Sequence, residues 1–410
     1  MQKILVVIGG GAAGFFCAIN AARLNPELRV IIIEKNNKLL SKVKISGGGR
    51  CNVTHACFDV DDLILKYPRG KYFVKKAFNW FSPTDTIEWF NQRGVALKTE
   101  ADNRMFPVTD SSQTIIDCLL TESRKYNVKI VLSCAVKSIL TINKAFKLLL
   151  TEDKILEADY VFVACGGFPQ TVQFNWLTNL GHSIEEPVPS LFTFNMPNNK
   201  ITELMGVSVE NVTVKIVGSK LKSNGPILIT HWGLSGPAIL KLSAWAARHL
   251  SAAKYQFTIT INWLGDMTEM VLKEKFFEYR LSLAPQKVIT KNPFGLPNRL
   301  WLYFLQLSGI SEETRWADLA SAPQYRLLRL LILQEIIVNG KTTFKEEFVT
   351  SGGIKLNEVD ANTMESKKIE NLFFGGEILD VDGVTGGFNF QHAWTSGWIA
   401  ARTIAEKSQR

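Results

Sequence analysis

Hydrophobic and polar positions follow three different rhythms along this chain. Near the N-terminus, the apolar run 4–8 breaks into glycines, continues as an apolar helix and is followed by a second apolar run, 29–33. Uninterrupted apolar runs of this length, separated by a helix, predict a strand–helix–strand unit in a buried parallel sheet. Further helices are predicted after Ser82-Pro83 and after Asp110-Ser111, because serine and proline are typical of helix starts.

The second rhythm consists of short alternating segments such as 207–217 and 256–261, which predict a β-rich insert. From Asp266 the apolar positions return to helical spacing, and Asp266 with Glu269 has the spacing of a capping box. The third pattern resembles the N-terminal one: the apolar run 371–374 is followed by a glycine-rich loop and a final amphipathic helix. We therefore expect an α/β protein whose first domain is interrupted by an insert.

The composition bounds the class of protein. With 410 residues and 46% hydrophobic content, the chain is long enough for two or three domains. No stretch approaches the ~18 unbroken apolar residues of a membrane span, and the first residues lack the features of a secretory signal, so we expect a cytoplasmic protein with no membrane partner. The six cysteines lack CxxC spacing, which argues against a zinc site or a disulfide framework, and we expect no metal.

The formal net charge of +9 bears on the choice of partner. A positive balance of this size is compatible with nucleic acid, an acidic surface or an anionic substrate. Lysines and arginines are spread along the sequence, with short clusters such as 66–76, so a solvated basic surface is the alternative.

The glycine turn at the N-terminus has the spacing of a dinucleotide-binding fingerprint. Gly9 allows a tight turn, Gly11 lets the backbone approach a pyrophosphate, and Gly14 lets the helix pack close to the strand. The helix that starts near Ala12 presents its free N–H groups to the diphosphate. Glu34 lies 20 residues beyond the last glycine, where a carboxylate grips a ribose 2′-hydroxyl and disfavours a 2′-phosphate. The ligand is therefore FAD or NAD rather than NADP.

Two other apolar strands also end in small residues, at Ala164-Cys165-Gly166 and at Gly375-Gly376-Glu377. In a doubly wound sheet, ligands lie at the carboxyl ends of the strands, so all three segments could meet around one elongated cofactor. FAD suits that reach better than NAD. The loop 380–389 then opens the last helix, whose dipole would stabilise a reduced flavin ring at its pyrimidine edge. The alternative for this loop is an ordinary glycine connection before a helix.

The segment Ser46–Asn52 is too glycine-dense for a routine connection. Its Arg50 carries a guanidinium able to fork onto a phosphate or a flavin carbonyl. Lys42 and Lys44 could neutralise phosphate or lie on a solvated basic loop. Cys51 could act as a thiol near the flavin, although a small packed cysteine is the competing interpretation.

Four blocks resemble the signatures of a bacterial flavoprotein family, the aminoacetone-oxidase-like or bile-acid-4,6-reductase-like NAD(P)/FAD-dependent oxidoreductases. They are the N-terminal fingerprint, 45–52, 230–238 and 375–389, and the resemblance spans essentially the whole chain. It implies a glutathione-reductase-like FAD-binding Rossmann domain interrupted by a β-rich insert and a small helical subdomain. The expected boundaries are 1–188 for the first part of the FAD-binding domain, 189–265 for the β-rich insert, 266–335 for the helical subdomain, 336–350 for the return of the insert and 351–410 for the C-terminal part of the FAD-binding domain.

The resemblance implies FAD contacts at Gly9, Gly11, Ala12, Ala13, Glu34, Lys35, Gly49, Arg50, Cys51, Asn52, Val136, Gly376, Glu377, Gly387, Phe388 and Asn389. The residue patterns add Gly14, Lys42, Gly48, Ala164, Cys165, Gly166, Asp382 and Gly386. Position 392 is histidine where relatives more often have an aromatic or aliphatic residue. The catalytic residues are unknown, with His392 and Cys51 as candidates, and the sequence favours a packed, hydrogen-bonded histidine and a small packed cysteine at these two positions.

These patterns predict an FAD-dependent oxidoreductase that transfers a hydride between flavin and a small organic substrate, acting as a reductase with NAD(P)H. The chain has no second dinucleotide fingerprint, so NAD(P)H would dock transiently. Three alternatives stay open: an amine oxidase that uses oxygen, a nucleic-acid-binding flavoprotein of the tRNA-modifying type, and a non-catalytic flavin-binding sensor. The charge favours the nucleic-acid alternative, whereas the lack of a long interleaved basic and aromatic stretch argues against it.

Overall fold

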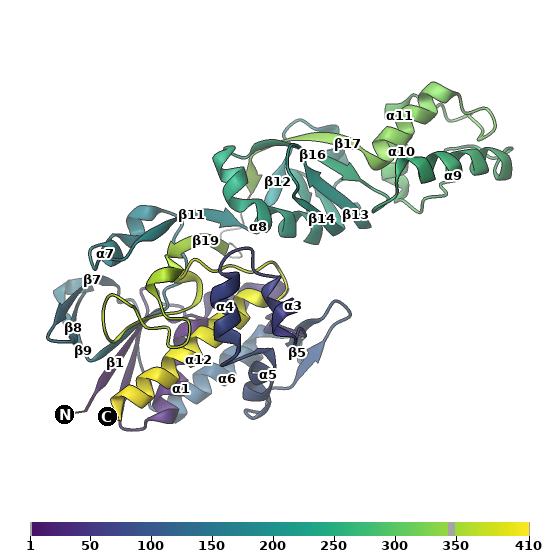
Figure 1. Ribbon diagram of the computed structural model, residues 1–410. Helices are drawn as coiled ribbons and strands as arrows, with labels where there is room; N and C mark the ends of the chain where they lie inside the picture. The colour runs from purple at the N-terminus through teal and green to yellow at the C-terminus, as the bar shows by residue number, and fades with distance from the viewer. Residues whose placement is uncertain (1, 343–348, 410) are drawn as a thin grey trace. The chain divides into compact units, whose positions relative to one another are not determined.

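The computed structural model describes residues 2–342 and 349–409 and divides the chain into two compact units (Figure 1). Unit 1 consists of Met1–Ser190 and Phe344–Arg410, and unit 2 of Leu191–Thr343. Strand β11 (Ile184–Ser190) pairs with β19 (Val349–Ile354) inside unit 1. We expected the insert to begin at 189 and the first domain to resume at 351. The first boundary of unit 2 therefore lies two residues later than expected, and unit 1 resumes seven residues earlier, with the paired strands β11 and β19 both in unit 1.

The centre of unit 1 is a five-stranded parallel sheet in the order β20-β10-β1-β2-β6. Its strands are nearly continuous apolar runs, as expected for strands covered on both faces. This arrangement confirms the predicted Rossmann-type α/β fold. The strands span β1 Ile4–Ile8, β2 Arg29–Ile33, β6 Lys129–Val131, β10 Tyr160–Val163 and β20 Leu372–Phe374.

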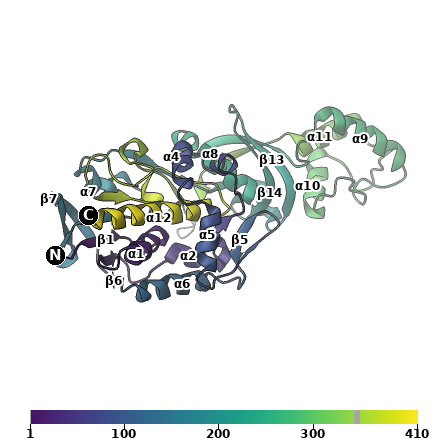
Figure 2. The same cartoon turned by 60° about the horizontal axis from the view of Figure 1, so that its bottom comes forward.

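Two helices from opposite ends of the chain, α1 (Ala12–Leu24) and α12 (Phe388–Ser408), run side by side in both views of the fold (Figure 1, Figure 2). They approach closely at Gly397, where an added Cβ would lie 2.7 Å from the carbonyl oxygen of Ala13. The C-terminal helix is therefore part of the nucleotide-binding fold, although almost 380 residues separate it from the fingerprint.

The remaining elements of unit 1 include two small antiparallel sheets, β3-β5-β4 and β7-β8-β9. The predicted helix starts are present: Ser82 and Asp85 form a capping box, and the Ser111 side chain accepts from the Gln113 N–H. The elements are α2 Ser41–Gly49, β3 Thr54–His55, α3 Val60–Ile64, α4 Lys71–Phe78, α5 Pro83–Asn91, β4 Leu97–Thr99, β5 Arg104–Pro107, α6 Ser112–Lys125, β7 Val136–Ile142, β8 Ala145–Leu150, β9 Ile155–Ala158 and α7 Asn175–Thr178.

Unit 2 contains a seven-stranded sheet in the order β17-β16-β13-β14-β15-β12-β18 and four helices among its described residues. The sheet and helices share one hydrophobic core that includes Trp263, Trp301 and Phe304. Its strands are β12 Thr193–Asn195, β13 Ser208–Ile216, β14 Lys222–Thr230, β15 Gly233–Ser235, β16 Gln256–Asn262, β17 Gln334–Asn339 and β18 Lys341–Thr342. Its helices are α8 Pro237–Ala252, α9 Glu269–Ser282, α10 Asn298–Ser308 and α11 Ser321–Ile332.

The predicted capping box of Asp266 with Glu269 is wrong. The N-cap of α9 is Thr268, whose hydroxyl accepts from the Val271 N–H, and the Asp266 carboxylate accepts from the Thr213 hydroxyl at 3.2 Å. The Asp266 side chain therefore bonds to strand β13, which is distant in the sequence, and does not cap α9 as its spacing had predicted. None of the helices in the described ranges has the length and hydropathy needed to cross a membrane.

Candidate functional site

The segments predicted at the cofactor follow neighbouring strands and lie at one edge of the parallel sheet. The Gly9 N–H donates to the Ile33 carbonyl at 2.8 Å, and the Ala164 N–H donates to the Ile8 carbonyl at 2.8 Å. On the other side, the Gly375 N–H donates to the Val163 carbonyl at 3.1 Å. The structure therefore brings the three glycine-rich segments together at the edge where doubly wound folds bind ligands.

Two of the fingerprint glycines are required by packing, and the third borders open space. Gly9 has a φ of +115°, and an added Cβ would lie 2.4 Å from the Ala164 carbonyl oxygen. A Cβ on Gly14 would lie 2.0 Å from the Gly9 carbonyl oxygen. In contrast, no atom lies within 4 Å of a Cβ built on Gly11, the N-cap of α1. This leaves room for a ligand directly in front of the free N–H groups of Ala12 and Ala13.

Glu34 is held at the end of β2 by the main chain. One carboxylate oxygen accepts from the Gly10 N–H at 2.8 Å, and the other accepts from the Asn36 N–H at 2.9 Å. A carboxylate has further lone pairs, so both oxygens can still accept from the hydroxyls of a ribose. The Cys134 N–H donates to the Glu34 carbonyl at 2.9 Å, which places Val136, at the start of β7, near this corner.

The glycine-dense segment forms a left-handed turn whose arginine has protein partners. Gly48 and Gly49 have φ values of +69° and +83°, and a Cβ on either would meet no atom within 4 Å. The Arg50 guanidinium donates to the Glu100 carboxylate at 2.6 Å and lies 4.1 Å from the centroid of the Phe106 ring. In this structure the side chain of Arg50 is therefore ion-paired, and the backbone of the two glycines is the part that borders open space.

Cys51 follows this turn and is fully buried. Burial raises the pKa of its thiol to about 12, so the group stays protonated at neutral pH. This favours the packed cysteine over a thiolate nucleophile, since the thiolate is the reactive form. Cys165 is also held as a thiol, because burial raises its pKa to about 12.

Lys42 and Glu377, both predicted to lie near the cofactor, are in contact with each other. Their ammonium and carboxylate groups lie 2.5 Å apart, and the second Glu377 oxygen accepts from the Thr350 N–H at 2.8 Å. Lys35 instead lies over the Phe168 ring, 5.7 Å from its centroid. The pair formed by Lys42 and Glu377 ties the start of α2 to the turn that follows β20.

Asp382, which we predicted to contact the cofactor, has protein partners in this structure. It is fully buried, and its two oxygens accept from the Arg69 guanidinium, at 2.6 Å from Nε to Oδ1, and from the Ser190 hydroxyl at 2.8 Å. Burial raises the pKa of this carboxyl, against the opposing effect of Arg69. We therefore assign Asp382 to holding the loop before α12. The sequence analysis did not identify Arg69, whose partner lies 313 positions away.

The loop before α12 is pinned by side-chain amides. Asn389 bonds Gly383 in both directions, at 2.8 and 2.9 Å, while the Asn52 amide accepts from the Gly387 N–H at 3.0 Å. Gly386 and Gly387 have φ values of +130° and +92°. The first turn of the 21-residue helix contains no acidic residue, so the N–H groups from Phe388 onward and the positive end of the helix dipole are available to a ligand.

His392 is the strongest sign of a missing partner in unit 1. It is buried, and neither ring nitrogen has a hydrogen-bond partner among the described residues. Burial lowers its pKa to about 4, so the imidazole is neutral at pH 7. The Ser396 hydroxyl donates to the His392 carbonyl and accepts from the Gly376 N–H, so the histidine belongs to the same edge of the sheet. The packed, hydrogen-bonded histidine that the sequence favours stays a prediction, and the Gly376 main chain acts on the pKa of His392 in the direction of such a bond, opposite to burial.

These observations fit a nucleotide cofactor. At the carboxyl edge of the parallel sheet there is open space in front of Gly11, Gly48, Gly49 and Gly166. The Glu34 carboxylate, the N-terminus of α1 and the His392 imidazole lie at the same edge. Native structures satisfy nearly all buried polar atoms, so the ring nitrogens of His392 call for a ligand or water. The individual cofactor contacts stay predictions.

Comparison with known proteins gives a consistent picture. The family described as "HI0933-like protein Rossmann domain" matches residues 3–403. The chain is 31% identical over 416 residues to the "Ribosomal RNA dihydrouridine synthase" of Escherichia coli and 27% identical over 410 residues to the "3-dehydro-bile acid delta(4,6)-reductase" of Clostridium scindens, with 98% of both chains covered in each case. A solved 3-ketosteroid-delta4-(5alpha)-dehydrogenase from Rhodococcus jostii has a TM-score of 0.52 at 12% identity, covering 98% of this chain and 97% of that one, and this likeness concerns the fold alone.

Proposed function

Because the chain belongs to the HI0933-like Rossmann-domain family, we propose that it is an FAD-dependent oxidoreductase that reduces a carbon–carbon double bond conjugated to a carbonyl group. The names of the two curated relatives share this chemistry, since a delta(4,6)-reductase and a dihydrouridine synthase both saturate such a bond. A hydride adds to the carbon remote from the carbonyl, and a proton adds to the carbon beside it. Bound FAD, once reduced by two electrons from the donor, would supply the hydride.

The observation that carries the proposal is the set of hydrogen-bonding groups around open space at the carboxyl edge of the parallel sheet. Glu34 would accept from the ribose hydroxyls, and the N–H groups that follow Gly11 would bind the diphosphate. The N-terminus of α12 would face the flavin, where its positive dipole end stabilises negative charge on the ring. His392, neutral and without a partner among the described residues, would hydrogen-bond to the cofactor or hold the water that supplies the proton.

The electron donor in this proposal is NADH or NADPH. The described residues contain a single parallel sheet, and FAD would occupy its edge, so the nicotinamide would dock transiently. Mixing holoprotein with each dinucleotide in the absence of oxygen should bleach the flavin absorbance with at least one of them. Flavin that stays oxidised with both would contradict a reductase and favour the amine oxidase or the sensor.

The acceptor we propose is a uracil ring in RNA. Residues 191–343 contain 17 Lys and Arg against 10 Asp and Glu, a formal charge of +7, whereas the rest of the chain carries +2. A unit with this excess of positive charge suits a phosphate backbone, which attracts proteins through salt-sensitive contacts. A small enone, our expectation from the sequence, is the second candidate and is supported by the relative that acts on a bile acid.

The two acceptors can be separated with one preparation. Reduced holoprotein is incubated without oxygen with ribosomal RNA from cells that lack this gene, and separately with a steroid 4-en-3-one. Dihydrouridine detected by mass spectrometry of the digested RNA, lost as salt is raised, supports RNA. Reduction of the steroid with unchanged RNA would assign the small-molecule acceptor and overturn the RNA proposal.

Replacement of Glu34 tests the ribose contact. We expect Glu34→Ala to bind FAD roughly tenfold or more weakly, since a hydrogen bond to a charged group contributes about 1.5–3 kcal/mol. The measurement is the flavin-to-protein ratio after dialysis, with thermal unfolding of both apoproteins as the control for the lost bond to Gly10. Flavin content equal to that of the wild type would mean that the ribose is held elsewhere.

A further inference from the structure

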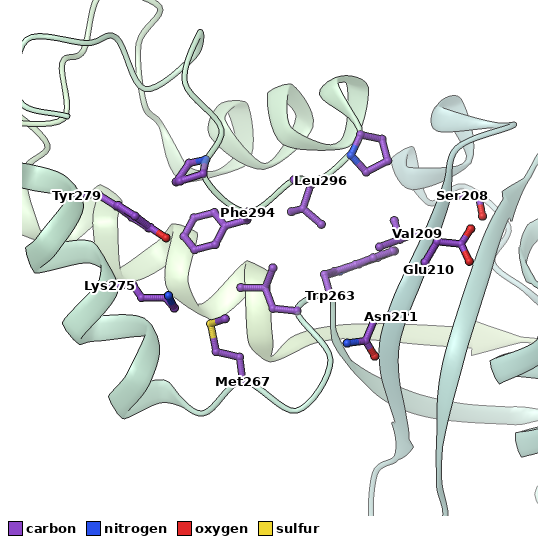
Figure 3. A pocket seen from close by; sticks show the side chains of 14 residues that line it. Ser208, Val209, Glu210, Asn211, Trp263, Met267, Lys275, Tyr279, Phe294 and Leu296 are labelled. Atoms are coloured by element: carbon purple, nitrogen blue, oxygen red, sulfur yellow. The ribbon is translucent and has the colours of Figure 1, made fainter. Parts of the chain in front are cut away.

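Unit 2 contains a cavity that the proposed function does not use. Its volume is about 420 Å³, within the range of small-molecule sites. Strand β13 forms one side of the cavity, α9 forms the other, and the loop 293–297 borders it, while the cavity stays open to solvent (Figure 3). All of these elements belong to unit 2.

The lining between these two sides is about half polar and half apolar, and its apolar part is partly aromatic. Trp263 lies at the centre of the view, and Phe294, Leu296 and Met267 surround it (Figure 3). The Trp263 ring is buried beneath this surface, with its indole N–H donating to the Gln334 side chain at 2.7 Å, so the aromatic surface open to a ligand belongs to Phe294 and Tyr279. Such walls suit a flat apolar body, which aromatic rings contact over a large area.

The polar side chains that line the cavity include several hydrogen-bond donors. Lys275 and Tyr279 extend into it from α9, whereas the Glu210 carboxylate is turned away from it (Figure 3). Lys275 is half-buried, and among the described residues neither its ammonium group nor the Tyr279 hydroxyl has a polar partner. Across the cavity, the Asn211 oxygen already accepts from Asn224 at 3.0 Å, so the remaining polar group of Asn211 is its amide N–H₂.

We propose that this cavity binds a small organic anion with a flat apolar body. The acid group would lie at Lys275 and Tyr279, and a carbonyl or other acceptor at the opposite end would meet Asn211. An anion would form a charge-assisted hydrogen bond with the Lys275 ammonium group, and the two neutral donors around the same space would add hydrogen bonds to its oxygen atoms. The site is separate from the proposed reduction and does not depend on it.

Calorimetric titration of the full-length holoprotein with two matched probes tests this site. The probes are 2-naphthoate and its neutral counterpart 2-naphthalenemethanol. We expect naphthoate to bind at least about tenfold more tightly than the alcohol, because a charge-assisted hydrogen bond is roughly twice as strong as a neutral one. In Lys275→Gln this preference should disappear, while Tyr279→Phe, which keeps the ring contact with Phe294, should weaken naphthoate binding a few-fold.

Lys273→Gln is the matched control on the same helix. Lys273 is exposed and paired with Glu269 at 2.7 Å, so its replacement should leave both affinities unchanged. The proposal is overturned by naphthoate binding that is equally tight in wild type and Lys275→Gln, by equal loss in both lysine variants, or by no binding to a wild-type protein that is folded and yellow.

Discussion

Gly11→Ala is expected to give a folded protein that loses its flavin. No atom lies within 4 Å of a Cβ at this position, and its φ of −96° and ψ of −170° are accessible to alanine. The stability of the apoprotein should therefore change by no more than about 1 kcal/mol, the usual cost of alanine at an N-cap. The added methyl group would instead occupy the space of the diphosphate, and FAD affinity should fall tenfold or more, which corresponds to at least ~1.4 kcal/mol.

Gly14→Ala provides the comparison three residues away. Here the added Cβ would lie 2.0 Å from the Gly9 carbonyl oxygen, a main-chain atom that cannot move without distorting the turn. We expect a loss of stability of about 3 kcal/mol, at the upper end of overpacking in a well-packed core. Urea unfolding of the apoproteins and flavin titration together separate the two effects. Full flavin binding by a well-folded Gly11→Ala protein would show that no cofactor approaches this glycine.

The sequence predicted those parts of the site that local spacing encodes. A strand, a glycine turn and a helix lie within a few residues of one another, so the pattern of Gly9, Gly11 and Gly14 specifies their geometry, and Glu34 follows at the end of the next strand. The convergence of the three glycine-rich segments was also predictable, because parallel strands present their carboxyl ends at the same edge. The fingerprint geometry and the convergence of the three segments both follow from the order of strands and helices along the chain and from which strands are buried.

Ion pairing between distant residues was not predictable in the same way. A sequence shows that Arg50 and Asp382 carry charges, but their partners Glu100 and Arg69 are chosen by how the chain folds back on itself. The same reason explains the misassigned cap of α9, where Thr213 of a separate strand binds Asp266. The distribution of charge between the two units was also not predictable, because the net charge of +7 in residues 191–343 can be counted only when the limits of unit 2 are known.

Arg69→Met should be among the most destabilising single substitutions in unit 1. Asp382 is fully buried and the Arg69 side chain is 9% exposed, so the variant leaves a buried carboxyl group without its countercharge. Breaking such a pair costs about 3–5 kcal/mol. Because Asp382 holds the loop before α12, we also expect flavin retention to fall. Urea unfolding and flavin content measure the two effects.

Arg93→Met is the matched control for this variant. Arg93 and Glu122 form another largely buried pair in unit 1, with a distance of 2.8 Å between Nε and Oε2, and they lie in the turn after α5 and on α6, away from the loop before α12 in the sequence. Both variants should lose stability, but under conditions where each is folded only Arg69→Met should lose flavin. Equal flavin loss in the two variants would attribute the effect to general destabilisation. The double variant Arg69→Met with Asp382→Leu should recover much of the stability, because no buried charge then remains.

The pH dependence of Arg69→Met identifies the charge as the cause. Burial already raises the pKa of Asp382, and removal of Arg69 takes away the opposing effect and raises that pKa further. The folded variant then holds a proton at this carboxyl group that the unfolded chain, with an ordinary pKa of about 3.9, releases. Its stability is therefore greatest at low pH and falls as pH rises through the folded-state pKa, so the deficit relative to wild type should narrow on acidification from pH 8 to about pH 5. A deficit that stays constant over this range would mean that the variant loses packing rather than a countercharge.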